Sequence, residues 1–161
     1  MPGIDECLLE AMSLPGARGA WLVDWTSGLA LGAAGDSPVG DHETTAAEAA
    51  ELARAAAEYD SFAGVPTPTT AIVLATANTR ASTARATRPG PETPPREGAL
   101  PKGPPVEDLI VTTRSGYHVL RFVDTAFDSS VFLHLWLDRD TGNLALARLR
   151  LRDLAERLVL G

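Results

Sequence analysis

Apolar residues gather in three closely spaced segments of the C-terminal third, and each segment predicts a β-strand. The segments cover residues 106–113, 117–124 and 130–138, with only short connections between them. Because short connections join antiparallel neighbours, we expect a three-stranded meander. The first connection, Arg114-Ser115-Gly116, is typical of a tight hairpin in which Gly116 takes a positive φ angle.

An amphipathic helix is predicted after the meander. Leucines and alanines recur there at steps of three and four residues, and arginines lie between them, as in a helix with one apolar face. The apolar positions are Leu144, Ala147, Leu151, Leu154, Ala155 and Leu158, and the arginines are Arg148, Arg152 and Arg157. The sheet needs further layers, which the N-terminal third supplies.

The N-terminal third predicts a short helix followed by a hairpin. The helix has acidic residues in its first turn and ends at Pro15-Gly16. Strands are predicted over residues 19–25 and 29–33, joined by a turn at Thr26-Ser27-Gly28. The apolar face of the short helix comprises Ile4, Leu8, Leu9 and Met12.

A long helix rich in alanine is predicted over residues 45–59. Thr45 and Glu48 have the spacing of a capping box, which marks a helix start. The predicted buried side offers little apolar volume but lets another backbone approach closely, either the sheet of the same chain or a second copy of the helix. Helix propensity alone is the simpler explanation of the same alanines. They are Ala46, Ala49, Ala50, Ala53 and Ala57.

The segment 65–105 differs in composition, because it holds nine of the twelve prolines. Such a composition predicts disorder or polyproline-like extension. We therefore expect a long disordered insertion within a single domain that spans residues 1–161. An apolar run at 71–75 interrupts the insertion and fits a transient helix, an added edge strand or a partner-docking peptide.

Charge is unevenly distributed along the chain. The insertion carries a net charge of +3, so the remaining 120 residues carry −10, since the whole chain carries −7. The insertion is then either a solvated linker or a basic strap that docks on an acidic surface. Negative net charge argues against nucleic acid as a partner, because a phosphate-binding surface needs clustered Lys and Arg.

Other bulk properties indicate a cytoplasmic protein of one domain. At 161 residues and 45% apolar content, the chain is long enough for one core. We expect no membrane-spanning helix, because no apolar run approaches the roughly 18 residues that one needs, and no signal peptide. The single cysteine, Cys7, excludes an internal disulfide and is predicted to be a small buried hydrophobe.

Few residues suggest chemistry, and we expect no catalytic, cofactor-binding or metal-binding residues. A glycine-rich phosphate-binding loop is absent. His118 and His134 lie on neighbouring predicted strands, which fits either a metal or proton-relay pair or neutral imidazoles in the core. Trp21, Trp25 and Trp136 belong either to the core or to an interface. Aspartates at strand ends and turns are expected to accept hydrogen bonds from backbone N–H groups. They are Asp24, Asp36, Asp41, Asp124, Asp128, Asp138 and Asp140.

Three stretches carry a resemblance to a known family. They are Gly19-Ala20 leading to Leu22-Val23-Asp24 and Ser27-Gly28, the alanine helix, and Asn143-Leu144-Ala145-Leu146-Ala147 at the start of the last helix. In this combination the chain resembles the bacterial branch of the Roadblock family of dynein-light-chain-like domains. The resemblance covers about 120 of the 161 residues, all except the insertion, which most members of the family replace by a short turn.

The resemblance implies an α+β fold with elements in the order α-β-β-α-β-β-β-α and a five-stranded antiparallel sheet. Two terminal helices would cover one face of the sheet and the alanine helix the other. Members of the family pair as dimers, joining two sheets edge to edge into ten strands while the two middle helices meet. Such pairing would also cover an edge strand that otherwise invites aggregation.

The resemblance also implies a function without catalysis. Bacterial members of the family regulate or bind Ras-like small GTPases, often beside a sensor histidine kinase, and the family has no catalytic residues of its own. We therefore expect a homodimeric regulator or partner of such a GTPase that modulates its GTP hydrolysis. The alternative is a dimeric scaffold or adaptor without effect on GTP turnover. A small-ligand sensor would need an apolar pocket with a few polar groups.

The dimer surface is expected on the alanine helix and on the first strand of the C-terminal meander. The insertion between these two elements would either cover this surface or tether an additional partner. The residues expected at the dimer surface are Glu48, Ala49, Leu52, Ala53, Tyr59, Val106, Leu109 and Val111.

Overall fold

The computed structural model describes residues 3–62, 104–124 and 130–160. These residues belong to one compact unit of the chain, formed by residues 1–63 and 102–161. The second unit, 64–101, lies outside the described residues, and with it lie the apolar run at 71–75 and nearly all of the predicted insertion.

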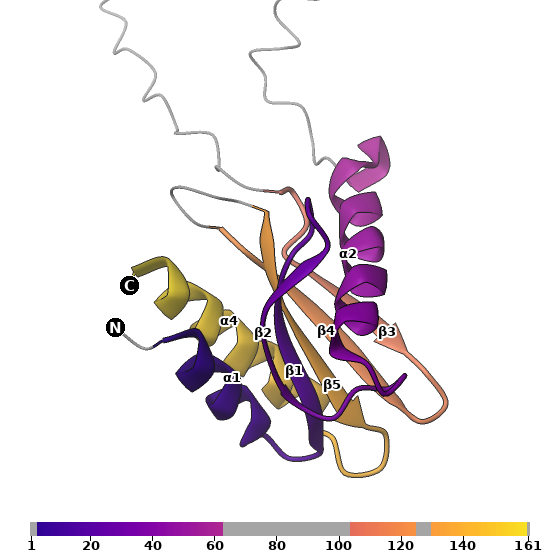
Figure 1. The fold of residues 1–161 in the computed structure, drawn as a ribbon, viewed down its shortest axis with the longest axis vertical. Coiled ribbons are helices and arrows are strands. Elements are labelled where there is room, and N and C mark those ends of the chain that lie inside the picture. Colours follow the sequence, from indigo (N-terminus) through magenta and orange to yellow (C-terminus); the bar gives the residue numbers. More distant parts are fainter. Residues whose placement is uncertain (1–2, 63–103, 125–129, 161) are drawn as a thin grey trace, which may run out of the picture. The chain divides into compact units, whose positions relative to one another are not determined.

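Helices and strands follow one another in the predicted order (Figure 1). They are α1 (Ile4–Met12), β1 (Ala17–Asp24), β2 (Leu29–Gly35), α2 (His42–Glu58), the 3₁₀-helix η1 (Asp60–Phe62), β3 (Asp108–Thr112), β4 (Gly116–Val123), β5 (Val131–Asp138) and α4 (Leu144–Leu160).

The five strands form one antiparallel sheet with the order β2-β1-β5-β4-β3. The predicted meander is confirmed, because β4 pairs with both β3 and β5. The N-terminal hairpin joins the meander through β1 and β5, which pair from Asp24↔Val131 to Ala17↔Leu137. This architecture confirms the predicted α+β fold class and leaves β2 and β3 as the two edges of the sheet.

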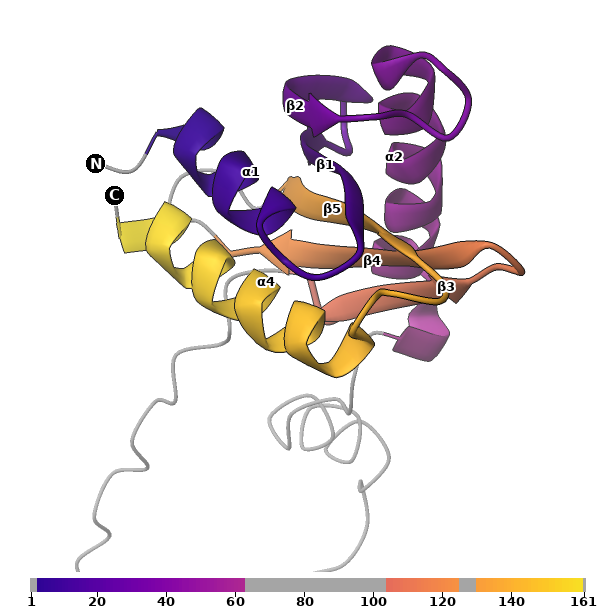
Figure 2. The same cartoon turned by 90° about the horizontal axis from the view of Figure 1, so that it is seen from below.

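Helices cover both faces of the sheet. The helices α1 and α4 lie side by side on one face, and α2 lies on the other (Figures 1 and 2). Side chains alternate along β5, so that Leu133, Leu135 and Leu137 pack toward α1 and α4 while Phe132 and Trp136 pack toward α2. Because both faces are buried, β5 is apolar almost throughout.

The layer of α1 and α4 is built from the apolar positions predicted in the sequence. Leu8 and Cys7 are buried, and burial raises the pKa of the Cys7 thiol. Leu9 is exposed, so its predicted place on the apolar face is wrong; it lies one residue, about 100° of helical turn, beyond Leu8. Glu10 and Arg157 form an ion pair of 2.6 Å between the two helices. The buried residues of α4 are Ala147, Leu151, Leu154 and Ala155.

The β3–β4 hairpin closes differently from the prediction. Gly116 belongs to β4 and is not among the glycines with positive φ, so the predicted left-handed turn residue is wrong. Thr113 closes the hairpin instead: its N–H donates to the carbonyl of Gly116 at 2.8 Å, and its hydroxyl accepts from the N–H of Gly116 at 3.0 Å. A Cβ atom on Gly116 would lie 2.4 Å from the carbonyl oxygen of Leu137, so glycine is required by close packing.

The other predicted turns have the expected chemistry. Gly16 and Gly28 take positive φ angles of 75° and 76°. Asp24 accepts a hydrogen bond from the N–H of Thr26 at 2.9 Å. Asp138 accepts from the N–H groups of Thr141 and Asp140, and these bonds hold the pKa of its carboxyl below the usual value. Aspartate therefore organises the turns after β1 and β5.

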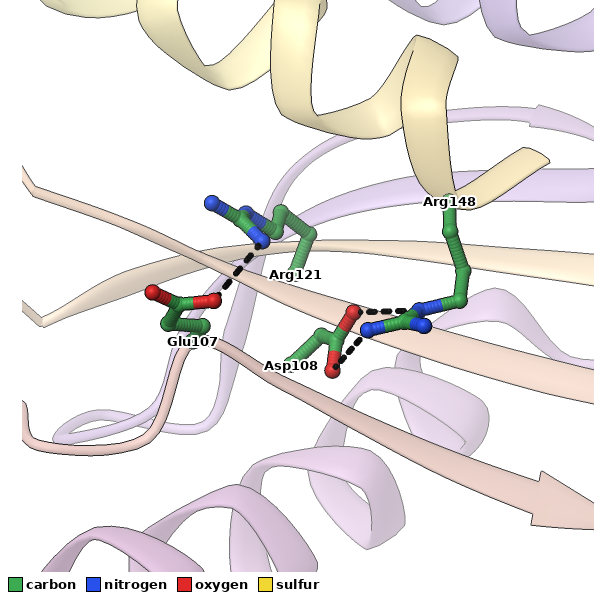
Figure 3. A network of polar contacts seen from close by, with 4 residues as sticks. All are labelled: Glu107, Asp108, Arg121 and Arg148. Carbon is green, nitrogen blue, oxygen red and sulfur yellow. Dashed lines mark hydrogen bonds and ion pairs between the residues drawn. The ribbon is translucent and has the colours of Figure 1, made fainter. Parts of the chain in front are cut away.

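Ion pairs connect the edge strand β3 to the rest of the fold (Figure 3). Arg148 of α4 reaches Asp108, and its Nε and Nη2 donate to the carboxylate at 2.8 and 3.3 Å. The Asp108 carboxylate raises the pKa of Arg148. Arg121 of β4 lies 4.0 Å from Glu107, which precedes β3. The edge strand is thus fixed in place from the face that α4 covers.

Candidate functional site

The helix α2 begins three residues earlier than predicted, at His42. Asp41 is its N-cap, and the carboxylate accepts hydrogen bonds from the N–H of Thr44, at 3.0 Å, and from the Thr44 hydroxyl. The predicted capping box at Thr45 is therefore wrong, because Asp41 already supplies the acceptor that a helix start needs. Thr45 lies inside the helix, with its Oγ1 2.8 Å from Oγ of Ser37.

The alanine face of α2 packs against the sheet of its own chain. Its alanines join a cluster with the large aromatic residues Trp21, Phe132 and Trp136. Small residues therefore serve a close approach of helix to sheet, one of the uses that the sequence left open. The buried alanines are Ala46, Ala49, Ala50, Ala53 and Ala56, whereas Ala57 is only partly buried.

A groove of about 280 Å³ lies beside α2, between its N-terminal half and the C-terminal end of β3. Val39 and Leu52 on its lining are exposed, which leaves apolar surface uncovered within the described residues. Polar groups from the sheet and from α2 also line it. The lining residues are Pro38 and Val39 from the loop before α2, Thr45, Glu48, Ala49 and Leu52 from α2, Val111, His118, Leu120 and His134 from the sheet, and Thr113 from the β3–β4 hairpin.

Most of the residues predicted at a dimer surface lie at this groove or next to it. Val106 and Leu109 are partly buried and pack in the cluster beneath α2. Ala53 is completely covered by its own chain, and Tyr59 is exposed at the C-terminal end of α2. Four predicted residues line the groove: Glu48, Ala49, Leu52 and Val111.

The three histidines of the chain are connected through rings beneath α2, in what we call the histidine ladder: His42, Trp21, His134 and His118. Nε1 of Trp21 donates to Nδ1 of His42 at 3.0 Å. Trp21 stacks on His134 with ring centroids 4.8 Å apart. Nε2 of His134 is 2.9 Å from Nδ1 of His118. The ladder ends at the groove, which both His118 and His134 line.

The histidine pair is built to be neutral. Burial, with a smaller contribution from the charge of His118, lowers the pKa of His134 to about 3, and burial also lowers the pKa of His118. Two neutral imidazoles can share one hydrogen bond, since each offers one donor and one acceptor. Within the described residues, no group of three His, Cys, Asp or Glu side chains could hold a metal ion. The geometry is that of a hydrogen-bonded core pair.

Sequence reasoning missed the groove and the two loops that contribute to its lining. Pro38 and Val39 line it from the loop before α2, and Thr113 lines it from the β3–β4 hairpin. Pro38 and Val39 lie among turn residues, and Thr113 ends a predicted strand, so neither neighbourhood indicates a groove. Tertiary packing, rather than any local pattern, brings these two loops together beside α2.

The fold is that of a Roadblock-like domain: a five-stranded antiparallel sheet with terminal helices on one face and the middle helix on the other. Among solved structures, the chain is similar to MglB from Myxococcus xanthus, with a TM-score of 0.54, 17% identity, and coverage of 93% of this chain and 80% of that chain. It is similar also to a Roadblock/LC7 domain from Streptomyces avermitilis, with a TM-score of 0.56, 13% identity, and coverage of 96% of this chain and 93% of that chain.

Comparison by sequence gives no match: neither a family model nor a curated protein corresponds to the chain. The likeness is therefore one of fold. In the part of the chain that the structure describes, no helix is long and apolar enough to cross a membrane.

Proposed function

We propose that this protein is a cytoplasmic homodimer that binds a Ras-like small GTPase, modulates its GTP hydrolysis and is not itself an enzyme. The observation that carries the proposal is the Roadblock-like fold, in which β3 forms an edge of the described sheet beside an apolar groove. The sequence resemblance to bacterial Roadblock domains supports the GTPase as the partner.

Of the two sheet edges, β3 is better suited to pairing with a second copy. Its register with β4 runs without interruption from Asp108↔Arg121 to Thr112↔Tyr117. The other edge, β2, has a shift of register opposite Leu22 and Val23. Because bulges and irregularities oppose edge-to-edge pairing, a second copy finds the more regular template at β3.

The backbone groups of β3 that point away from β4 belong to Asp108, Ile110 and Thr112. Glu107 and Thr113, which flank the strand, bond to β4 through their backbone groups, and such bonds alternate along an antiparallel strand. In an antiparallel pair of β3 strands centred on Ile110, each Asp108 lies opposite Thr112 of the other copy. The outward N–H and C=O groups of all three residues then form hydrogen bonds between the copies. This pairing also keeps the two Asp108 carboxylates from lying directly opposite each other.

The dimer is tested by measuring the mass of the full-length protein by light scattering across a range of concentrations. We expect a mass twice that of the 16.9 kDa chain. A mass of one chain at all concentrations would refute the homodimer.

The partner is tested by affinity pull-down from the native cell lysate, run in parallel with GTPγS and with GDP and read by mass spectrometry. We expect a small GTPase whose recovery depends on the nucleotide, followed by a change in its GTP turnover when the purified protein is added. Recovery of other proteins irrespective of nucleotide would reject the regulator and favour the adaptor.

A further inference from the structure

We propose that the groove beside α2 receives Tyr59 of the second copy, so that each copy of the dimer inserts one tyrosine into the other. The inference rests on the proposed pairing through β3. It adds to that pairing a specific occupant for the groove and a role for the exposed end of α2.

The direction of α2 relative to β3 determines which end of the helix lies beside the groove. The two elements run antiparallel to each other (Figure 1). The N-terminal half of α2 therefore lies beside the C-terminal end of β3, where Val111 and Thr113 line the groove. The C-terminal half of α2 lies toward Val106 and Leu109, which join the cluster that includes Ala53 and Ala57.

The symmetry of the pair determines which part of the second copy reaches the groove. Antiparallel pairing about Ile110 brings the N-terminal end of one β3 against the C-terminal end of the other, and a two-fold axis makes both contacts identical. Since α2 runs opposite to β3, the C-terminal end of α2 in the second copy faces the groove of the first. Tyr59, the C-cap residue of α2, lies at that end.

The side chains at that end have the chemistry of an interface. Tyr59 is 60% exposed and Phe62 is 51% exposed, and their ring centroids are 6.5 Å apart. Tyrosine combines a large apolar ring with one polar group and is enriched at the energetically dominant positions of interfaces. Phe62 would flank the inserted ring and shield it from water.

The groove has the matching properties. Its volume of about 280 Å³ is the space of about nine waters at roughly 30 Å³ each, which is enough for one aromatic side chain. Leu52, Val111 and Leu120 supply apolar lining. His118 is half-buried there, and among the described residues its Nε2 has no hydrogen-bond partner. A tyrosine hydroxyl both donates and accepts, so it suits Nε2 of His118 in either tautomer.

A cysteine pair tests the contact directly. Glu48→Cys and Tyr59→Cys are introduced together into full-length protein that carries Cys7→Ala. The two positions are eleven residues apart along α2, about 16 Å, so a disulfide cannot form within one copy. We expect oxidation to give a covalent dimer on a non-reducing gel without a ladder of larger species. The control is Leu149→Cys with Tyr59→Cys, because Leu149 is similarly exposed, at 52%. This pair should give no covalent dimer, since Leu149 lies on α4.

Substitutions of Tyr59 test the energetics in a second way. Tyr59→Ala should weaken dimerisation by roughly 100-fold or more, and Tyr59→Phe by roughly 10-fold or more, because the dimer loses one hydrogen bond at each of its two identical contacts. Leu149→Ala should leave the dissociation constant unchanged. Dissociation constants are measured by sedimentation with circular dichroism as the check on folding.

The outcomes separate this inference from the proposed pairing. If the wild type has the mass of a dimer but no 48–59 disulfide forms, or if Tyr59→Ala dimerises as tightly as the wild type, the tyrosine is not the occupant while the proposed homodimer stands. If the wild type has the mass of one chain, the pairing itself is refuted and the inserted tyrosine with it.

Discussion

At the scale of single residues, the histidine ladder depends on imidazoles that remain uncharged. His134 is almost completely buried, and it lies between Trp21 and His118. The sequence left two interpretations of the histidine pair, because position on neighbouring strands fixes neither burial nor distance. Their contact arises because residues 118 and 134 lie on the same face of paired strands, two positions apart in register.

We predict that acid destabilises the protein through His134. Its pKa of about 3 in the fold lies below the roughly 6.5 of an unfolded histidine, so the unfolded state binds the proton first. The contribution of neutral His134 to the free energy of unfolding is complete above pH 6.5 and is lost as the pH falls toward 3. The free energy of unfolding should decrease by about 2 kcal/mol between pH 8 and pH 5. Urea unfolding at the two pH values measures this difference.

The matched control is His134→Gln, which removes the titrating group and keeps a polar side chain. This variant is expected to be less stable than the wild type at pH 8. Its free energy of unfolding should change less between pH 8 and pH 5 than that of the wild type. The burial of His118 lowers its pKa as well and leaves a residual dependence of the same sign. Equal pH dependence in both proteins would show that His134 is not the group responsible.

We predict a second effect at the residue scale for Gly116→Ala. The added Cβ would lie 2.4 Å from the carbonyl oxygen of Leu137, and strand backbone cannot move away freely. The free energy of unfolding should fall by roughly 1–3 kcal/mol, the usual cost of overpacking. Thermal or urea unfolding measures the loss. Gly3→Ala is the control, because its Cβ would meet nothing within 4 Å; an equal change in both would contradict close packing as the reason for Gly116.

At the scale of elements, the sequence predicts the order of helices and strands well because each has its own periodicity. The β5 segment is apolar almost throughout, and α4 repeats leucine at helical spacing. The start of α2 could not be predicted as well, since Asp41 and Thr45 both have side chains that cap helices. The strand order and the groove depend on contacts between distant segments, above all β1 with β5, which no local pattern specifies.

The edge strand gives a prediction at this scale. Thr112→Pro removes an N–H that points away from β4, so the β3–β4 ladder keeps its bonds while a second copy loses one bond at each end of the pair. The dimer dissociation constant should rise by roughly tenfold or more. Sedimentation measures the constant, and circular dichroism checks the fold. Thr112→Ala retains the N–H and should dimerise normally; if both variants dimerise as the wild type does, β3 is not the paired edge.

At the scale of the whole molecule, the segment between η1 and β3 starts and ends at the proposed dimer surface. Residue 62 follows the C-terminal end of α2, and residue 104 precedes β3. The segment 65–105 also carries the net positive charge, while the remaining residues are strongly acidic. Both facts make replacement of the segment a direct test of whether it influences pairing or partner binding.

The last prediction concerns replacement of residues 65–103 by a Gly/Ser linker of about twelve residues. The composition of this segment predicts that it lacks a core of its own. Shortening the connection lowers its closure entropy, so the free energy of unfolding should rise by about 1 kcal/mol. Urea unfolding measures this change, and light scattering and the 48–59 disulfide report whether the dimer persists. We expect the mass of the dimer and the 48–59 disulfide to persist. If the segment is a tether, one partner should be lost from the pull-down. A less stable protein, or one that no longer forms the disulfide, would instead place the segment within the packed structure of the dimer.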